Sequence, residues 1–288
     1  MNQFVKLTGA FMFYSVLFIS CGDGNVEDLD DVIKNDEDAI EDIFELILNE
    51  RNMKDIDIVL GAKGSPLQLI LANVYHIDAP TGNISLREAE EVIKHPMIES
   101  GIPLAYGDNY RGYRIVGSNH TYPEHYGVEI AKGKLWKDDF EVTLGARIAE
   151  ETGLEIGDTF YSSHGLTDST NVHADKAFTV VGILSRSETV VDKLILTGLE
   201  SVWGVHATEE EQNLSPEELY ASREITAMLI KKRSPMAIMN VAKALEGTDM
   251  QVALPAIEIN RLKRLLTFFC RNSKCICNSG GYDVEIGE

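Results

Sequence analysis

Two histidines and a glutamate lie close together in the sequence and have the residue types that could bind a metal ion. His120, Glu124 and His125 fall within one short stretch, and zinc accepts imidazole and carboxylate ligands. Their spacing matches no helical metal motif, and Pro123 restricts the backbone between the two histidines. We therefore expect a surface turn here, with a metal site as the alternative that the sequence leaves open.

A second polar cluster has the residue types of a serine hydrolase. Ser162, Ser163 and His164 are followed by His173 and Asp175, and serine, histidine and aspartate make up a catalytic triad. The chain has no Gly-x-Ser-x-Gly turn, which presents the nucleophile in α/β-hydrolases. Serine, threonine and asparagine crowd the stretch and are typical of loops. We interpret residues 163–175 as a polar loop, with hydrolase chemistry as a minor alternative.

A glycine-containing segment, Gly61-Ala62-Lys63-Gly64-Ser65, invites comparison with phosphate-binding loops. Such a loop needs four residues between its first glycine and a closing Gly-Lys-[Ser/Thr], whereas Lys63 here precedes Gly64. We expect a tight turn between two strands. His76 is interpreted as the end of a strand and not as a catalytic base. The sequence thus predicts no catalytic residue, no cofactor and no metal.

The four cysteines lie outside the middle of the chain, at Cys21, Cys270, Cys275 and Cys277. This placement excludes a disulfide framework for a folded core. The three cysteines near the C-terminus are too sparse for a zinc site and have no histidine nearby.

The N-terminus has the pattern of a secretion signal. An apolar run at residues 7–20 is shorter than the roughly 20 residues that span a bilayer, and it fits the apolar region of a signal peptide. Residues 17–21, Leu-Phe-Ile-Ser-Cys, resemble a relaxed bacterial lipobox in which Cys21 is the lipidated residue. We interpret residues 1–21 as a lipoprotein-like anchor; an uncleaved anchor or a plain signal stays open.

The net charge of −20 is concentrated near the N-terminus. Residues 22–50 carry twelve carboxylates against Lys34 alone, a net of −11. Such acidity argues against nucleic acid as a partner, because phosphates are bound by clusters of lysine and arginine. It favours solubility, with an acidic binding surface as the alternative. We interpret residues 22–52 as an acidic linker that continues into a short amphipathic helix at about 36–52.

Short strands and helices alternate from residue 55 to residue 266. Ser85, Ser215 and Ser234 are each followed by a glutamate or a proline at a position typical of helix starts. Gly153 is typical of a helix end. We predict strands at 55–60, 67–75, 98–106, 110–117, 141–144, 159–162, 177–184, 193–197, 224–231 and 250–254, with a turn at 107–109. Predicted helices are 85–94, a single turn capped by Thr121, 146–151, one starting at 215, 234–247 with the apolar face Ile238, Met239, Ala242 and Leu245, and 257–269.

The pattern predicts an α+β fold with mixed sheets. We expect a core domain at residues 53–266, with a strand-rich subdomain inserted at about 118–222. Residues 267–288 are expected to form an atypical polar tail. Beyond the N-terminal run, no stretch of sequence is long and apolar enough to span a bilayer.

Long stretches of the chain resemble, in order, the MacB-like periplasmic core domain of FtsX-like ABC transporter permeases. The resemblance covers about residues 50–266 and rests on strings of residues instead of one motif. These strings are residues 57–71 (DIVLGAKGSPLQLIL), 74–84, 102–117 (IPLAYGDNYRGYRIVG), 133–136, 152–160, 163–166, 178–184 (FTVVGIL), 196–203 and 253–259.

The resemblance implies a non-catalytic domain on the periplasmic side of a bacterial membrane. It implies as partners a separate ATP-binding subunit, a second permease copy and, as a further candidate, a periplasmic adaptor. Two departures stand out: the short run ending at Cys21 replaces a membrane helix, and no membrane helices follow Phe269. We therefore expect a truncated permease, with a free-standing envelope lipoprotein that binds a ligand or a protein as the alternative.

Overall fold

A computed structural model describes residues 46–163, 172–205 and 211–272, with side chains at 46–162, 176–205, 211 and 213–264. Leu46–Glu258 form one compact unit, and the residues from Ile259 onward belong to another. The first unit contains all the strands described below. The linker prediction at 22–45 and the tail at 273–288 lie outside the described residues.

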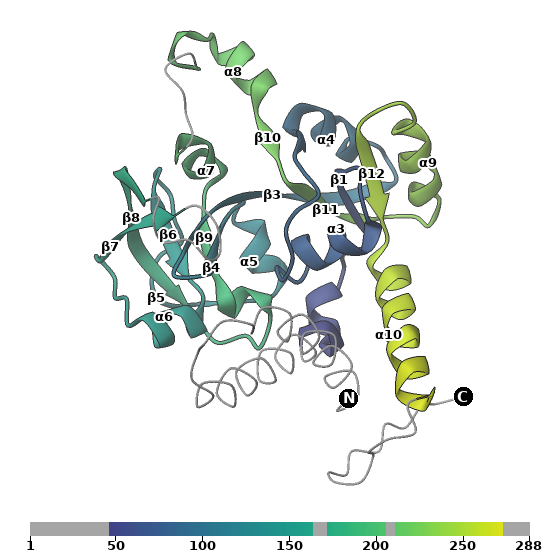
Figure 1. Cartoon of the computed structure of the whole chain (residues 1–288). Coiled ribbons are helices and arrows are strands. Elements are labelled where there is room, and N and C mark those ends of the chain that lie inside the picture. The colour runs from purple at the N-terminus through teal and green to yellow at the C-terminus, as the bar shows by residue number, and fades with distance from the viewer. Residues whose placement is uncertain (1–45, 164–171, 206–210, 273–288) are drawn as a thin grey trace, which may run out of the picture. The chain divides into compact units, whose positions relative to one another are not determined.

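The unit is built on a mixed sheet (Figure 1). Its ten strands follow the order β12-β1-β11-β3-β4-β9-β6-β8-β5, with β7 paired to β3 and β8. The pairs β4–β9 and β6–β8 are parallel and the others antiparallel. The bounds are β1 (Ile58–Ala62), β3 (Ile98–Tyr110), β4 (Tyr113–Gly117), β5 (Ile130–Gly133), β6 (Glu141–Leu144), β7 (Thr159–Ser163), β8 (Val172–Leu184), β9 (Leu194–Thr197), β11 (Ala227–Lys232) and β12 (Met250–Ala253); β2 (Ile84–Ser85) pairs separately with β10 (Glu224–Ile225).

Helices connect and cover these strands, so the α+β prediction with mixed sheets is confirmed. They are α3 (Pro66–Asn73), α4 (Leu86–Ile93), α5 (Thr121–His125), α6 (Ala146–Thr152), α7 (Leu199–Val205), α8 (Pro216–Ser222), α9 (Met236–Ala244) and α10 (Pro255–Asn272), with 3₁₀ turns η2 (Glu50–Met53), η3 (Val190–Lys193) and η4 (Glu211–Asn213). Ser85 and Ser215 cap α4 and α8 as predicted, and Gly153 ends α6 in the left-handed conformation at φ 69°.

The strand predicted at 67–75 is wrong, because this segment is the helix α3. Ser65 accepts a hydrogen bond from the Gln68 backbone N–H at 3.3 Å, and Pro66 occupies the first turn, where its missing N–H costs nothing. The predicted turn at 61–65 therefore joins a strand to a helix. The run is apolar on nearly every face, so its 3.6-residue period is not visible in the sequence.

The turn predicted at 107–109 is also wrong. β3 continues to Tyr110, and the reversal lies at Arg111 and Gly112, whose φ angles of 50° and 85° are typical of a type I′ turn. The pairing of β3 with β4 shifts register between Tyr106 and Asn109. The intervening glycine and aspartate thus form a bulge within a strand and not its end.

Several element boundaries and faces differ from the sequence predictions. β1 starts at Ile58 and is buried along its length, so it does not alternate. The strand predicted at 224–231 is divided into β10 and β11 at Thr226. His120, and not Thr121, is the N-cap of α5. α9 buries Ala237 and Val241, and it leaves the predicted face residues Met239 and Ala242 exposed; Leu245, which is buried, follows the end of the helix.

The sheet contains two hydrophobic cores, which define two halves of the unit (Figure 1). The first half comprises strands β12, β1, β11 and β3, and the second half comprises β4, β9, β6, β8 and β5. The first core includes Ile58, Leu60, Ile98, Met228, Ile230, Val241 and Leu245; the second includes Ile115, Val142, Leu144, Phe160, Phe178, Val180 and Ile195. The subdomain boundary at 118–222 stays a prediction.

Candidate functional site

The two histidines considered as metal ligands contact different groups. His120 is exposed, and its Nε2 lies 2.7 Å from the backbone oxygen of Trp136. His125 packs edge-on against the ring of Tyr126, with 5.0 Å between ring centroids. Within the part of the chain that the structure describes, no group of three or more histidine, cysteine, aspartate or glutamate side chains could hold a metal ion.

The hydrolase alternative concerns residues whose side chains lie outside the described ones, namely Ser163, His164, His173 and Asp175. The neighbouring Ser162 is buried, and its hydroxyl donates to an Asp108 carboxylate oxygen at 3.0 Å. This contact joins β7 to the bulge of β3. It accounts for the one serine of the cluster whose surroundings the structure describes.

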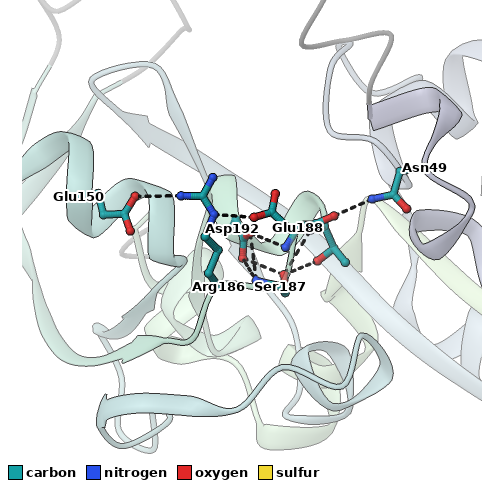
Figure 2. Close-up of polar contacts among 7 residues, drawn as sticks. Asn49, Glu150, Arg186, Ser187, Glu188 and Asp192 are labelled. Carbon is teal, nitrogen blue, oxygen red and sulfur yellow. Dashed lines mark hydrogen bonds and ion pairs between the residues drawn. The ribbon is translucent and has the colours of Figure 1, made fainter. Parts of the chain in front are cut away.

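The segment that leads into β1, residues 46–57 (the lead-in segment), is fastened to the second half of the sheet by amide side chains. Asn52 is fully buried, and its Oδ1 accepts from the Val190 backbone N–H at 3.0 Å. The Asn52 Nδ2 donates to the Leu46 carbonyl at 2.9 Å. Asn49 donates to the Glu188 carbonyl at 2.6 Å (Figure 2). Both asparagines thus hold the backbone of one loop, residues 186–193.

Asp192 shapes that loop from within. Its carboxylate accepts the backbone N–H of Ser187 at 2.9 Å and of Glu188 at 2.8 Å, and the Ser187 hydroxyl at 2.7 Å (Figure 2). Glu188 has a positive φ of 54°, a conformation that costs a non-glycine residue energy unless its surroundings fix it. Because Asp192 is buried and its oxygens are hydrogen-bonded, the loop presents a fixed edge to Asn49.

Arg186 extends the network to the protein surface. Its guanidinium pairs with Glu188 at 2.6 Å and with Glu150 on α6 at 3.3 Å. All three side chains are more than half exposed, so solvent and salt screen these ion pairs and weaken them. The buried amide and carboxylate contacts therefore carry more of the attachment than the ion pairs do.

The other end of the lead-in segment is fixed to the first half by charge. Asp57 accepts the Lys232 backbone N–H at 2.9 Å and pairs with the Lys232 ammonium group. Lys231 pairs with Glu99 on β3 at 3.1 Å and with Asp55 at 3.8 Å. The pKa of Lys231 is raised, mainly by its hydrogen bond to Glu99 and then by the charge of Asp55. The lead-in segment is thus held by both halves of the sheet.

A histidine–tyrosine cluster lies where α3, β3 and α5 meet. His76 has a positive φ of 59°; its Nδ1 lies 2.8 Å from the Tyr106 hydroxyl and its Nε2 2.7 Å from the Tyr122 hydroxyl. The Tyr106 hydroxyl donates its single proton to the Ala72 carbonyl. It must therefore accept from Nδ1–H, so Nε2 accepts from Tyr122. This network assigns the neutral Nδ1–H tautomer to His76.

The surroundings of His76 keep it uncharged. Removal from water, and then the nearby Arg114, lower its pKa from 6.5 to about 3. Burial also raises the pKa of Tyr106 and Tyr122 above the ordinary value of 10.0, so both stay protonated donors. The prediction that His76 is a strand end is wrong, because it follows the helix α3 and bridges three elements.

Sequence reasoning missed Asn49, Asn52, Asp192 and the bonding role of His76. Asp192 offered a signal, because it interrupts an apolar run just before a buried strand, where a carboxylate needs partners. Asn52 offered no signal in the sequence, because its hydrogen-bond partner Val190 is 138 residues away. Arrangements of this kind bind and position backbone.

Cys21, the predicted lipidation site, lies outside the described residues. Among the residues that are described, no helix combines enough length with enough apolar character to cross a membrane. The predicted anchor at 1–21 therefore stays a prediction.

No family model matches the chain, and none of the curated proteins compared with it is similar. Several solved structures are similar to it, and two of them are described here. The periplasmic region of MacB from Actinobacillus actinomycetemcomitans is 14% identical, with a TM-score of 0.47, covering 82% of this chain and 99% of that one. The extracellular domain of the noncanonic ABC-type transporter YknZ from Gram-positive bacteria is 13% identical, with a TM-score of 0.42, covering 68% and 98%.

Proposed function

We propose that this chain is the extracytoplasmic, non-catalytic domain of a MacB/FtsX-type ABC transporter permease, and that it couples ATP-driven motion to export or envelope transport. The observation that carries the proposal is the sequence resemblance, which runs in order through strings of residues from 57 to 259. In such a protein the ATP-binding subunit, a second permease copy and a periplasmic adaptor are the partners.

The path of the chain supports this proposal. β1 and β12 are antiparallel neighbours, and Val59 pairs with Ala253. The chain therefore enters the sheet at Ile58 and leaves it at Ala253 on the same side of the same strand pair. A domain placed between two membrane helices needs this arrangement, because both connections must return to one membrane surface.

The lead-in segment provides a route for coupling. Asn49 and Asn52 fasten it to the 186–193 loop of the second half, and Asp57 fastens it to β11 of the first half. A displacement of this segment would act on both halves at once. We propose that motion generated at the membrane reaches the domain through these contacts, with the protein located on the periplasmic side.

The proposed permease ancestry is tested by the DNA immediately downstream of the coding sequence. If the chain derives from a truncated or split permease, that DNA encodes several apolar helices of about 20 residues in one of its reading frames. If no reading frame encodes such helices, the proposed truncation is wrong and a free-standing protein is favoured.

The alternative, an envelope lipoprotein that binds a ligand or partner, is favoured by the lipobox-like sequence ending at Cys21. Growth with a radiolabelled fatty acid should label the wild-type chain and should not label Cys21→Ala. Cys270→Ala is the matched control and should keep the label. An unlabelled wild-type chain would contradict the lipid anchor while leaving the domain assignment untouched.

A further inference from the structure

Residues of α4, of α9 and of the segments that follow these helices line a groove in the first half of the unit. Glu88, Glu91 and Val92 line it from α4, Ala244 lines it from α9, and Val241, Leu245 and Met250 are its buried apolar residues. The groove has a volume of about 300 Å³, at the lower end of the roughly 300–1,000 Å³ typical of protein binding sites. None of the contacts described so far uses it.

The two walls have helical geometry. Its α4 residues recur three and four positions apart, and Asn240 and Ala244 on the opposite side are four positions apart within α9, so each wall includes one face of a helix. Side-chain ridges at this spacing accept the ridges of a further helix laid between them. The shape therefore suits a helical segment.

The rim carries negative charge. Glu88 and Glu91 are exposed, and the described residues lining the groove include no lysine or arginine. Lys94 pairs with Glu91 at 2.6 Å, but both side chains are 64% exposed, and such a pair is weak and easily exchanged. Lys94 also lowers the pKa of Glu91 through their hydrogen bond, which keeps this carboxylate ionised.

Apolar surface continues beyond the groove along α9. Met236 and Met239 are 51% and 68% exposed, and a flexible thioether side chain adapts to differently shaped apolar partners. The groove has buried apolar residues at its base and acidic residues at its edge, and exposed methionines lie beside it. The surface is therefore both apolar and negatively charged. A partner must offer apolar side chains on one face and positive charge beside them.

We propose that the α4–α9 groove binds a basic amphipathic helix of a partner protein, with its apolar face against Leu245 and Met250 and its cations beside Glu88 and Glu91. A second copy of this chain would bring a further net charge of −20 to the acidic rim, which disfavours self-association through it. The proposal is independent of the permease assignment, because it rests on the groove alone.

A designed peptide tests the proposal directly. The probe is a fluorescent peptide of about 15 residues, with leucine at helical spacing and lysine elsewhere. Fluorescence anisotropy should show saturable binding to the full-length chain. A peptide of the same composition, permuted so that its leucines do not share a face, should bind at least about tenfold more weakly.

Substitutions in the α4–α9 groove test whether the peptide binds there. Ala244→Trp should fill the groove and weaken binding at least about tenfold; Ala244 is exposed, so the larger side chain should leave the fold intact, as circular dichroism can verify. Asn240→Arg provides a second block by placing a cation in the groove. The double variant Glu88→Gln/Glu91→Gln should weaken binding about threefold to tenfold.

The matched control for charge is Glu129→Gln/Glu155→Gln, two exposed carboxylates of the second half. It should leave binding unchanged. Equal weakening by this control, or unchanged binding with both Ala244→Trp and Asn240→Arg, would overturn the proposal in favour of general attraction to an acidic protein. Self-association of the wild-type chain that Ala244→Trp abolishes would overturn it in favour of a second copy.

Discussion

The two halves of the sheet are stabilised in different ways. The buried core of the first half is aliphatic, with Met228 and Met250 among its members and no buried aromatic ring among the described ones. The second core stacks rings: Phe160 lies 4.4 Å from Tyr110 and 5.7 Å from Phe178, measured between ring centroids. Aromatic pairs have preferred geometries, whereas methionine fills irregular space. The second core is therefore the more specific in shape.

The backbone shows the same contrast. In the second half, a Cβ built on Gly182 would lie 2.0 Å from the Lys134 carbonyl oxygen, and one on Gly145 would lie 2.2 Å from the Val191 carbonyl oxygen. In the first half, a Cβ on Gly101 would meet only side-chain atoms, of Ile93 and Met228. Side chains can move aside more easily than backbone can. The first half should therefore tolerate substitutions that the second does not.

The largest expected effect comes from glycine. Gly182→Ala should lower the free energy of unfolding by about 3 kcal/mol or more, because β5 must move away from β8. Gly101→Ala should lower it by about 1 kcal/mol, since Ile93 and Met228 can change rotamer. Urea unfolding of both variants measures the difference. Equal losses would show that the two halves do not differ in backbone constraint.

A smaller effect is expected where the lead-in segment meets the second half. Asn52→Ala removes the bonds to Val190 and Leu46 and leaves buried backbone groups unpaired, so it should cost about 2 kcal/mol. Asn49→Ala should cost less than about 1 kcal/mol, because its surroundings are exposed and water can replace the bond to Glu188. Similar losses in the two variants would argue against a buried attachment.

A further effect depends on pH and tests the histidine–tyrosine cluster where α3, β3 and α5 meet. The pKa of His76 is lowered from 6.5 to about 3 in the folded chain, so its contribution to stability is complete above pH 6.5 and is lost as the pH falls towards 3. His76→Asn tolerates the positive φ and should cost on the order of 1–2 kcal/mol at neutral pH. The gap between wild type and variant should shrink as the solution is acidified.

Tyr122→Phe is the matched control for this experiment. It removes one hydrogen bond to His76 but keeps the imidazole in place, so the acid-dependent part of the stability should persist. Urea unfolding across this pH range provides the measurement. A gap between wild type and His76→Asn that stays constant with pH would contradict the lowered pKa of His76.

Local signals in the sequence predicted the elements that depend on local contacts. Ser85, Ser215 and Gly153 determine helix ends through bonds within a few residues, and the predicted boundaries there are close to the observed ones. The helix at Pro66 was missed although Ser65 is an N-cap followed by a proline, a typical helix start. The residues after Pro66 are almost all apolar, so the sequence shows no helical period. A glycine at 107 likewise suggested a turn where the chain forms a bulge.

The candidate site could not be predicted from the sequence because its contacts are distant along the chain. Asn52 and Val190 are 138 residues apart, and His76 and Tyr122 are 46 apart. Nothing local distinguishes these asparagine and tyrosine residues from others in the sequence. The sheet must first align the strands before the side chains can meet, so tertiary structure alone identifies the site.

The pairing of β1 with β12 also determines how the unit responds to force. Its two points of attachment, at Ile58 and Ala253, lie at the same end of an antiparallel pair. If these two points are pulled apart, the hydrogen bonds of the pair break one after another, so the force required is small. Moving both points together leaves every bond of the pair unloaded. The β1–β12 pair is therefore weak against separation of these two points and robust when they move together.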